Sequence, residues 1–202
     1  MSAIEYFYAA HSAYAYLGSA RFMQIAQAAG RTIEHKPVDL RRVVSESGSV
    51  PFSERTPGHR AYFFGREMKR WSEQRDAPLL GHRPTHHDND ITLPNCLLIA
   101  GVVQGLDIDE LAHALLTAHW TNDANLADPG TLATIARDAG YEPDSLLKAA
   151  ADPQVRDIYA ANTEDAIARS VFGSPTYFVD GDMFYGQDRL EMVERALSRP
   201  YA

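Results

Sequence analysis

A run of apolar and aromatic residues near the start of the chain, Ile4 to Ala10, has the period of two that predicts a buried strand. A helical pattern follows over Ala13 to Ala29 and ends before Gly30, a residue type that favours helix ends. Ser12 stands at the junction between strand and helix as a candidate N-cap. A second strand is predicted over Thr32 to Leu40, so the start of the chain predicts a parallel, right-handed βαβ unit. Pro37 interrupts the second strand, which predicts a sheet edge or a strand end because proline has no N–H for the ladder.

The middle of the chain changes to helical patterns. Residues 41–60 are polar and broken by prolines, and residues 76–94 predict a long irregular loop. Helical periodicity is present over residues 61–74, 95–104, 109–120, 129–139, 144–150 and 152–170.

Strand character returns near the end of the chain, at residues 175–180 and 183–186, and the Asp180-Gly181 pair between them predicts a tight hairpin turn. The element order predicts an α/β protein in which both chain ends form one thioredoxin-like sheet. We therefore expect a discontinuous thioredoxin-like domain, residues 1–40 and 163–202, with an inserted all-helical domain over residues 41–162.

Composition narrows the class of protein. The chain of 202 residues has a net charge of −8, which argues against nucleic acid as a partner because phosphate binding needs a basic surface. No apolar run is long enough to span a membrane, and the N-terminus lacks the features of a secretory signal, so a cytoplasmic location is expected. Cys96 is the only cysteine, which excludes a dithiol oxidoreductase and predicts a small buried apolar side chain.

Four stretches carry a family resemblance, in the family's order over nearly the whole chain: FYAAHSAYAYLGS (7–19), LPNCLLIA (93–100), NDANLADPGTLATIARDAGY (122–141) and NTEDAIARSVFGSPTYFVDGDMFYGQDRL (162–190). By these stretches the chain resembles the 2-hydroxychromene-2-carboxylate isomerases and the related kappa-class glutathione transferases, in the DsbA-like branch of the thioredoxin superfamily. The resemblance implies a thioredoxin fold with an inserted helical domain, glutathione as cofactor, and a homodimer.

Ser12 is the expected catalytic residue. A helix N-terminus carries about half a positive charge and unpaired N–H groups, so it favours an anion. Dithiol oxidoreductases place a protein thiolate there. This chain supplies no sulfur at that point, and the thiol of bound glutathione would occupy the same field, with the Ser12 hydroxyl donating a hydrogen bond to the thiolate. An N-cap role alone also explains Ser12.

The sequence GSPT before the third strand favours a cis bond between Ser174 and Pro175, although an ordinary trans proline also fits. In thioredoxin-like proteins the residue before such a proline presents its backbone to a bound peptide. Since glutathione is a peptide, the resemblance implies that Ser174 and Pro175 contact its cysteinyl unit.

A final helix is predicted over residues 188–197, where Asp188 and Glu191 predict a capping box. The resemblance gives the same place a cofactor role. The helix N–H groups suit the γ-glutamyl carboxylate and the Asp188 carboxylate suits its ammonium. Gln187, Asp188 and Arg189 are therefore expected to bind glutathione.

A small aromatic carboxylate is the expected substrate. Asn95 is a candidate substrate contact as well as a helix N-cap, and Tyr14, Trp71 and Phe64 are candidate walls, for each of which ordinary packing is the alternative. The chain departs from the family twice. Ser12 is followed by alanine where the family has proline, and the family's lysine near Pro57 is absent. Arg60 is the candidate cation in its place, although its planar fork differs from a lysine ammonium.

The implied reaction converts 2-hydroxychromene-2-carboxylate to trans-o-hydroxybenzylidenepyruvate, by reversible addition of a glutathione thiolate across a double bond that then rotates. Two alternatives stay open: a transferase that conjugates glutathione to an electrophile, and a thioredoxin-fold binding module without turnover.

His82 to Asp90 is rich in histidine, but His86 and His87 are adjacent and their side chains diverge, so no metal is expected. His11 either tunes the charge beside Ser12 or belongs to a surface loop.

Overall fold

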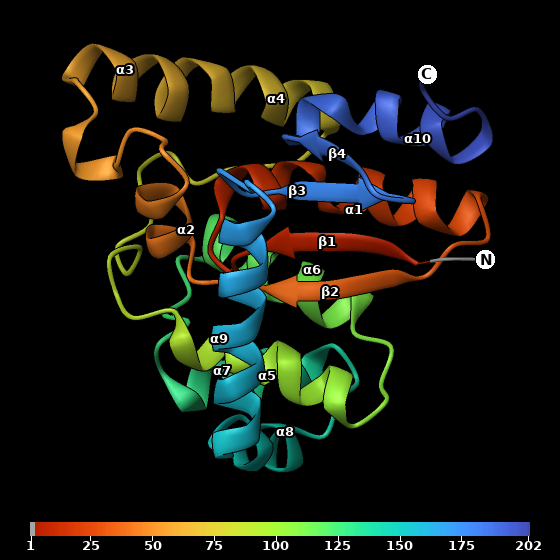
Figure 1. Cartoon of the computed structure of the whole chain (residues 1–202). Coiled ribbons are helices and arrows are strands. Elements are labelled where there is room, and N and C mark those ends of the chain that lie inside the picture. Colours follow the sequence, from red (N-terminus) through yellow and green to blue (C-terminus); the bar gives the residue numbers. More distant parts are fainter. Residues whose placement is uncertain (1–2) are drawn as a thin grey trace.

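A mixed four-stranded sheet in the order β2-β1-β3-β4 lies at the centre of the protein (Figure 1); the structure is a computed structural model that describes residues 3–202. The strands are β1 (Ile4–Tyr8), β2 (Ile33–Pro37), β3 (Thr176–Val179) and β4 (Asp182–Tyr185). β1 pairs parallel to β2 and antiparallel to β3, and β3 pairs antiparallel to β4. The prediction that the two chain ends share one thioredoxin-like sheet is confirmed.

The predicted βαβ unit is present, with α1 (Ala13–Ala28) between the parallel strands β1 and β2. Gly30 follows α1 with a φ of 63°, a left-handed conformation that glycine adopts without steric cost. Pro37 ends β2, which is an edge strand as predicted. Asp180 and Gly181 both have positive φ values, 51° and 93°, as the turn of a tight hairpin requires.

Helical elements fill the rest of the chain. They are α2 (Leu40–Glu46), the 3-10 helix η1 (Phe52–Glu54), α3 (Pro57–Ala61), the π-helix η2 (Tyr62–Glu67), α4 (Met68–Arg75), α5 (Thr92–Val103), α6 (Asp109–Asn122), α7 (Pro129–Asp138), α8 (Pro143–Ala150), α9 (Pro153–Ala168), the 3-10 helix η3 (Gln187–Arg189) and α10 (Leu190–Ser198). In Figure 1, α5, α7, α8 and α9 gather beside β2, while α3 and α4 lie on the β4 side of the molecule. No helix of residues 3–202 is long and apolar enough to cross a bilayer.

Three predictions about the elements need correction. Residues 40–61 are largely helical: α2 begins after its N-cap Asp39, α3 begins after its N-cap Thr56, and η1 lies between them. The predicted helix over 61–74 is a π-helix in its first part. The capping box is wrong, because η3 intervenes before α10 and no side chain caps either element.

The predicted domain boundary at residues 162 and 163 falls inside α9, which runs through it without a break. A single cluster of buried side chains joins the two predicted units. It contains Tyr6 and Tyr177 from the sheet together with Leu97 and Leu111 from the helical segment. The helical segment is therefore packed directly onto the sheet, and this shared core holds the loop between β1 and α1 in place. Cys96 is buried as predicted.

Candidate active site

Ser12 occupies the N-cap of α1, as predicted, and its residue is 6% exposed. Its Oγ accepts a hydrogen bond from the N–H of Ala15 at 3.3 Å and donates one to the carbonyl oxygen of Ser174, also at 3.3 Å. Both bonds are at the long end of the range, so the hydroxyl can turn toward a stronger acceptor at small cost. A thiolate at the start of α1 is such an acceptor, because a hydrogen bond to an anion is stronger than one to a carbonyl.

The peptide bond between Ser174 and Pro175 is cis. The Oγ of Ser174 accepts a hydrogen bond from the N–H of Ala9 at 3.3 Å, and the carbonyl oxygen of Pro175 accepts one from Gly186 at 2.9 Å. These contacts join the end of β1, the start of α1, the turn before β3 and the end of β4. The predicted serine–proline turn and the predicted serine therefore meet at one place.

Asn95 lies inside α5 with no exposed surface, and does not cap that helix. Its Oδ1 accepts from the N–H of Ala10 at 2.9 Å, while its Nδ2 donates to Val38 O and to Tyr159 Oη, both at 3.2 Å. A direct contact with substrate does not fit a side chain that is enclosed and fully hydrogen-bonded. Asn95 instead fixes the loop that carries Ser12.

Trp120 supports the same loop from α6, since its Nε1 donates to the carbonyl oxygen of His11 at 3.0 Å. The β1–α1 loop is thus held by two side chains from the helical segment, roughly 85 and 109 positions further along the chain. No local pattern marks either residue for this role.

Gln187 is buried in η3, and its Oε1 accepts a hydrogen bond from Arg75 Nε at 3.1 Å. Its Nε2 is enclosed without a hydrogen-bond partner among residues 3–202, so its two N–H donors are unused. The Arg75 guanidinium also binds the Gln187 carbonyl oxygen and pairs with Glu191 at 2.7 Å. Arg75 was not predicted as a site residue, and it fixes η3 against α4.

Asp188 and Arg189 are exposed neighbours whose side chains form an ion pair at 2.6 Å. The Asp188 carboxylate therefore already has one cationic partner. An ammonium group would share it or displace Arg189, at modest cost because exposed pairs contribute about 0–1 kcal/mol.

The three residues predicted to line the substrate site lie on α1, η2 and α4. Tyr14, half-buried in the first turn of α1, donates its hydroxyl to the carbonyl oxygen of Phe63 at 2.5 Å. Burial raises its pKa, so it stays a neutral donor. Phe64 is 38% exposed in η2. Trp71 is half-buried against the main core, with the Arg75 guanidinium 5.3 Å from its ring centroid.

Arg60 is not a free cation beside Ser12. Its guanidinium donates to the carbonyl oxygens of Phe52 and Ser53, at 3.1 and 3.0 Å, and so braces η1. The nearby Arg55 was not predicted. It lies over the rings of Phe52, Phe63 and Phe64. The phenylalanines near it in the sequence are the feature that could have marked Arg55 as a site residue.

His11, His87 and His119 form a cluster behind the Ser12 loop. His87 and His119 share a hydrogen bond of 2.9 Å between Nδ1 and Nε2, and the ring centroids of His11 and His87 are 4.8 Å apart. Burial lowers the pKa of His11 well below its usual value and that of His87 to about 3. All three rings are therefore neutral near pH 7. Residues 3–202 contain no set of histidine, cysteine or acidic side chains arranged to hold a metal ion.

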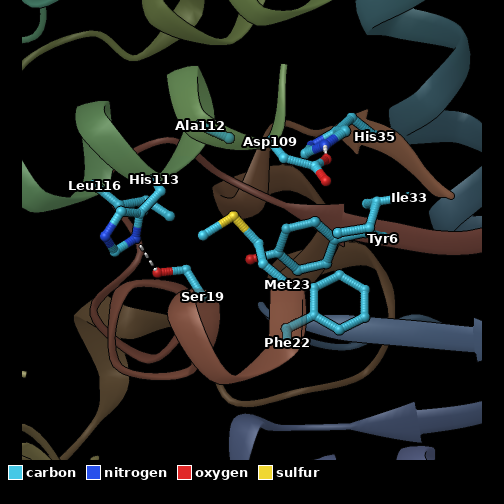
Figure 2. A pocket seen from close by; sticks show the side chains of 10 residues that line it. All are labelled: Tyr6, Ser19, Phe22, Met23, Ile33, His35, Asp109, Ala112, His113 and Leu116. Carbon is cyan, nitrogen blue, oxygen red and sulfur yellow. Dashed lines mark hydrogen bonds and ion pairs between the residues drawn. The ribbon is translucent and has the colours of Figure 1, made fainter. Parts of the chain in front are cut away.

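A small cavity of about 10 Å³ lies beside α1, some two turns beyond Ser12 (Figure 2). Tyr6, Ser19, His35 and His113 are among its lining residues, and the Tyr6 hydroxyl has no hydrogen-bond partner in the described part of the chain. The volume suits one water molecule at most, so this cavity is not a substrate site.

The chain belongs to the family of DSBA-like thioredoxin domains, whose model matches residues 3–198. It is 26% identical to a 2-hydroxychromene-2-carboxylate isomerase of Sphingobium xenophagum, over 96% of this chain and 97% of that one. A protein of the same name from Pseudomonas putida is 25% identical, over 97% of this chain and 94% of that one. These relatives support an isomerase function.

Solved structures agree with the family. A 2-hydroxychromene-2-carboxylate isomerase superposes with a TM-score of 0.79 at 26% identity, over 97% of this chain and 94% of that one. A probable DsbA oxidoreductase of Streptomyces coelicolor has the same TM-score at 17% identity, covering 99% and 90% of the two chains. The cytosolic disulfide reductase DsbM of Pseudomonas aeruginosa, solved with GSH, has a TM-score of 0.65 at 14% identity, covering 98% and 93%. The last two establish the fold alone.

Proposed function

We propose that the protein is a glutathione-dependent isomerase of the 2-hydroxychromene-2-carboxylate type. The observation that carries the proposal is the Ser12 hydroxyl at the start of α1, opposite the Ser174 carbonyl, in a chain with no cysteine at that position. The relatives named as isomerases and the GSH-bound relative of the same fold support it.

The residues around Ser12 fit glutathione. The enclosed Gln187 Nε2 is a donor without a partner, and the Asp188 carboxylate lies next to it in the chain, so an amino-acid group finds both a donor and a carboxylate there. The backbone of Ser174 suits the central peptide unit. When bound, glutathione supplies a thiol nucleophile that adds reversibly to an activated double bond and so permits its rotation.

The chain's own residues would do three things in this reaction. Ser12 would donate its hydroxyl hydrogen bond to the sulfur, and the N–H groups at the start of α1 would lower the free energy of its anion. Asn95 and Trp120 would hold the loop so that this geometry is present before binding. Tyr14 would remain protonated at neutral pH and keep η2 against α1.

A small aromatic carboxylate substrate, a homodimer and a cytoplasmic location belong to the same proposal. The second candidate is a kappa-class-like transferase, which would use the same site but consume glutathione. Counting free thiols during turnover separates the two, because an isomerase leaves the thiol concentration unchanged.

The test is an ultraviolet difference titration of glutathione into the wild type, Ser12→Ala and Ser45→Ala. Ser45 is an exposed helix serine whose hydroxyl bonds only to Arg42 O, so it controls for loss of a hydroxyl elsewhere. We expect a saturable thiolate absorbance in the wild type and Ser45→Ala, and a weaker one in Ser12→Ala. Equal signals in all three proteins would remove Ser12 from the mechanism, and no binding to the wild type would defeat the proposal.

A further inference from the structure

Arg55 is a cation that lies among three aromatic rings and pairs with no carboxylate of residues 3–202. Its guanidinium carbon lies 4.6 Å from the ring centroid of Phe52, 5.7 Å from that of Phe63 and 5.4 Å from that of Phe64. Within residues 3–202 its hydrogen bonding is limited to one weak contact, from Nε to Val50 O at 3.4 Å. The two terminal nitrogens therefore have no acceptor from the described chain.

Two arginines on the η3 side of the site are neutralised by carboxylates. Arg75 pairs with Glu191, and Arg189 pairs with Asp188. Arg55 forms no ion pair with any described residue, although burial lowers its pKa and so disfavours its charge. A partly buried charge without a counter-ion is costly, so this position favours the arrival of an anion.

Arg55 lies near both sides of the Ser12–Ser174 pair. On one side, its guanidinium carbon lies 5.7 Å from the Phe63 ring centroid, and the Phe63 ring lies 4.7 Å from that of Tyr14, two residues beyond Ser12 in α1. On the other side, Arg55 donates to Val50 O and the preceding Ser49 donates to Phe172 O. The Phe172 ring lies 4.5 Å from that of Tyr185, which pairs with Thr176 just after the cis bond. The hydrogen bond from Tyr14 to Phe63 O ties the phenylalanine segment to the start of α1. An anion held by Arg55 would therefore lie beside the place where the thiol is activated.

The rings around Arg55 suggest which anion fits. Phe64, whose ring centroid is 5.4 Å from the guanidinium carbon, is 38% exposed, and Tyr185 at the end of β4 is 36% exposed, so aromatic surface is available beside the guanidinium and toward β4. A ligand with an aromatic ring and a carboxylate would use both features, since rings pack on rings and a guanidinium fork matches a carboxylate. An aliphatic anion would use only the second.

We propose that Arg55 binds the carboxylate of an aromatic carboxylate substrate, with Phe64 and Tyr185 against the ring. This assignment rests on the proposed function, because it places the substrate beside Ser12. It gives to Arg55 the role that the sequence suggested for Arg60, and it makes Arg55 a determinant of specificity.

The test measures binding of trans-cinnamate and of cinnamyl alcohol by titration calorimetry, without glutathione. The two ligands share the ring and double bond but only the first has a carboxylate. We expect Arg55→Gln to weaken cinnamate binding about ten- to a hundredfold and to leave the alcohol unchanged. Arg55→Lys should be intermediate, because it keeps the charge and loses the fork.

Arg66→Gln is the matched control, since Arg66 is an exposed arginine in η2, the π-helix that carries Phe63 and Phe64, and its binding should equal that of the wild type. Equal losses for both ligands, a loss in the control, or no cinnamate binding to the wild type at millimolar concentration would overturn the assignment. If Arg55→Gln does not fold, binding of cinnamate by Arg55→Lys as tightly as by the wild type would overturn it. Glutathione titration is a separate measurement: its failure would defeat the isomerase proposal, while the cinnamate comparison still decides the role of Arg55.

Discussion

The side chain of Asn95 and the backbone of Ala10 are joined by a buried hydrogen bond of 2.9 Å, across 85 positions of the sequence. Ala10 lies two residues before Ser12, so a side chain of α5 determines where the candidate catalytic loop lies. Because the other amide atom of Asn95 is bonded to Val38 and Tyr159, the side chain cannot turn away without breaking three contacts.

Asn95→Ala should lower the free energy of unfolding by about 1–3 kcal/mol, because the N–H of Ala10 would remain buried without a partner. It should also weaken the thiolate signal of bound glutathione, since the Ser12 loop would lose its support. Urea denaturation and the ultraviolet titration measure the two effects. Asn89→Ala is the control, because Asn89 is exposed and its side chain makes one hydrogen bond within residues 3–202, to Asn125, so its stability should change by less than about 0.5 kcal/mol. If Asn95→Ala is as stable as this control, Asn95 does not fix the loop.

Gly18 allows α1 to approach η3 closely. A Cβ at this position would lie 2.6 Å from the Cβ of Gln187, closer than side-chain atoms normally approach. Gly18→Ala should therefore push η3 away, lower stability by about 1–3 kcal/mol and weaken glutathione binding. Gly58→Ala is the control, because open space surrounds Gly58. Calorimetric titration of glutathione checks the prediction, and unchanged affinity in Gly18→Ala would show that the position of η3 does not matter for binding.

The hydrogen-bonded pair of Glu5 and Arg169 predicts that the protein loses stability in acid. The hydrogen bonds of Glu5 with Arg169, at 2.5 and 2.9 Å, lower the pKa of the carboxyl from 4.5 to about 2. The folded state thus favours the ionised form, so the stabilisation is present above pH 4.5 and is lost as the pH falls toward 2. Allowing for solvent around the pair, we expect a loss of about 1–2 kcal/mol. Glu5→Gln should remove this part of the pH dependence in urea titrations, and an unchanged slope below pH 4.5 would contradict the assignment.

The histidine cluster has a defined proton arrangement. His119 Nδ1 lies 3.1 Å from the carbonyl oxygen of Ala124, which accepts but cannot donate, so Nδ1 carries the proton. His119 Nε2 is then an acceptor, and His87 Nδ1 donates to it. Protonation of His119 Nε2 would break this bond, because two N–H donors would then face each other.

The lowered pKa of His87 therefore predicts a second loss of stability in acid, which begins at a higher pH than the loss caused by Glu5. Burial lowers the pKa of His87 from 6.5 to about 3, so the folded state resists the proton that the unfolded chain takes up. The unfolded state binds more protons below pH 6.5, and stability must fall from there toward pH 3. His87→Asn should flatten the change between pH 6.5 and 4.5, whereas His59→Asn, on the exposed surface of α3, should not. The same slope in both variants would refute this account.

Local rules explain why the core of the fold was predictable. The strand-to-helix junction at Ser12, the end of β2 at Pro37 and the hairpin at Asp180 follow from periodicity, capping and backbone preference, all of which act within a few residues. The capping box at Asp188 failed for a tertiary reason. Gln187 is buried against α1 and hydrogen-bonded to Arg75. These contacts hold residues 187–189 as the separate 3-10 turn η3 before α10.

The sequence by itself determined that a hydroxyl replaces a sulfur at the start of α1, and that a serine–proline turn and a polar helix start accompany it. Only the tertiary structure decided which side chains surround that hydroxyl. Asn95 is a buried support, Arg60 braces η1, and Arg55 is a cation that forms no ion pair with any residue of 3–202. Residue type and spacing cannot distinguish these roles, because each depends on burial and on partners far away in the chain, which exist only once the helices have packed onto the sheet.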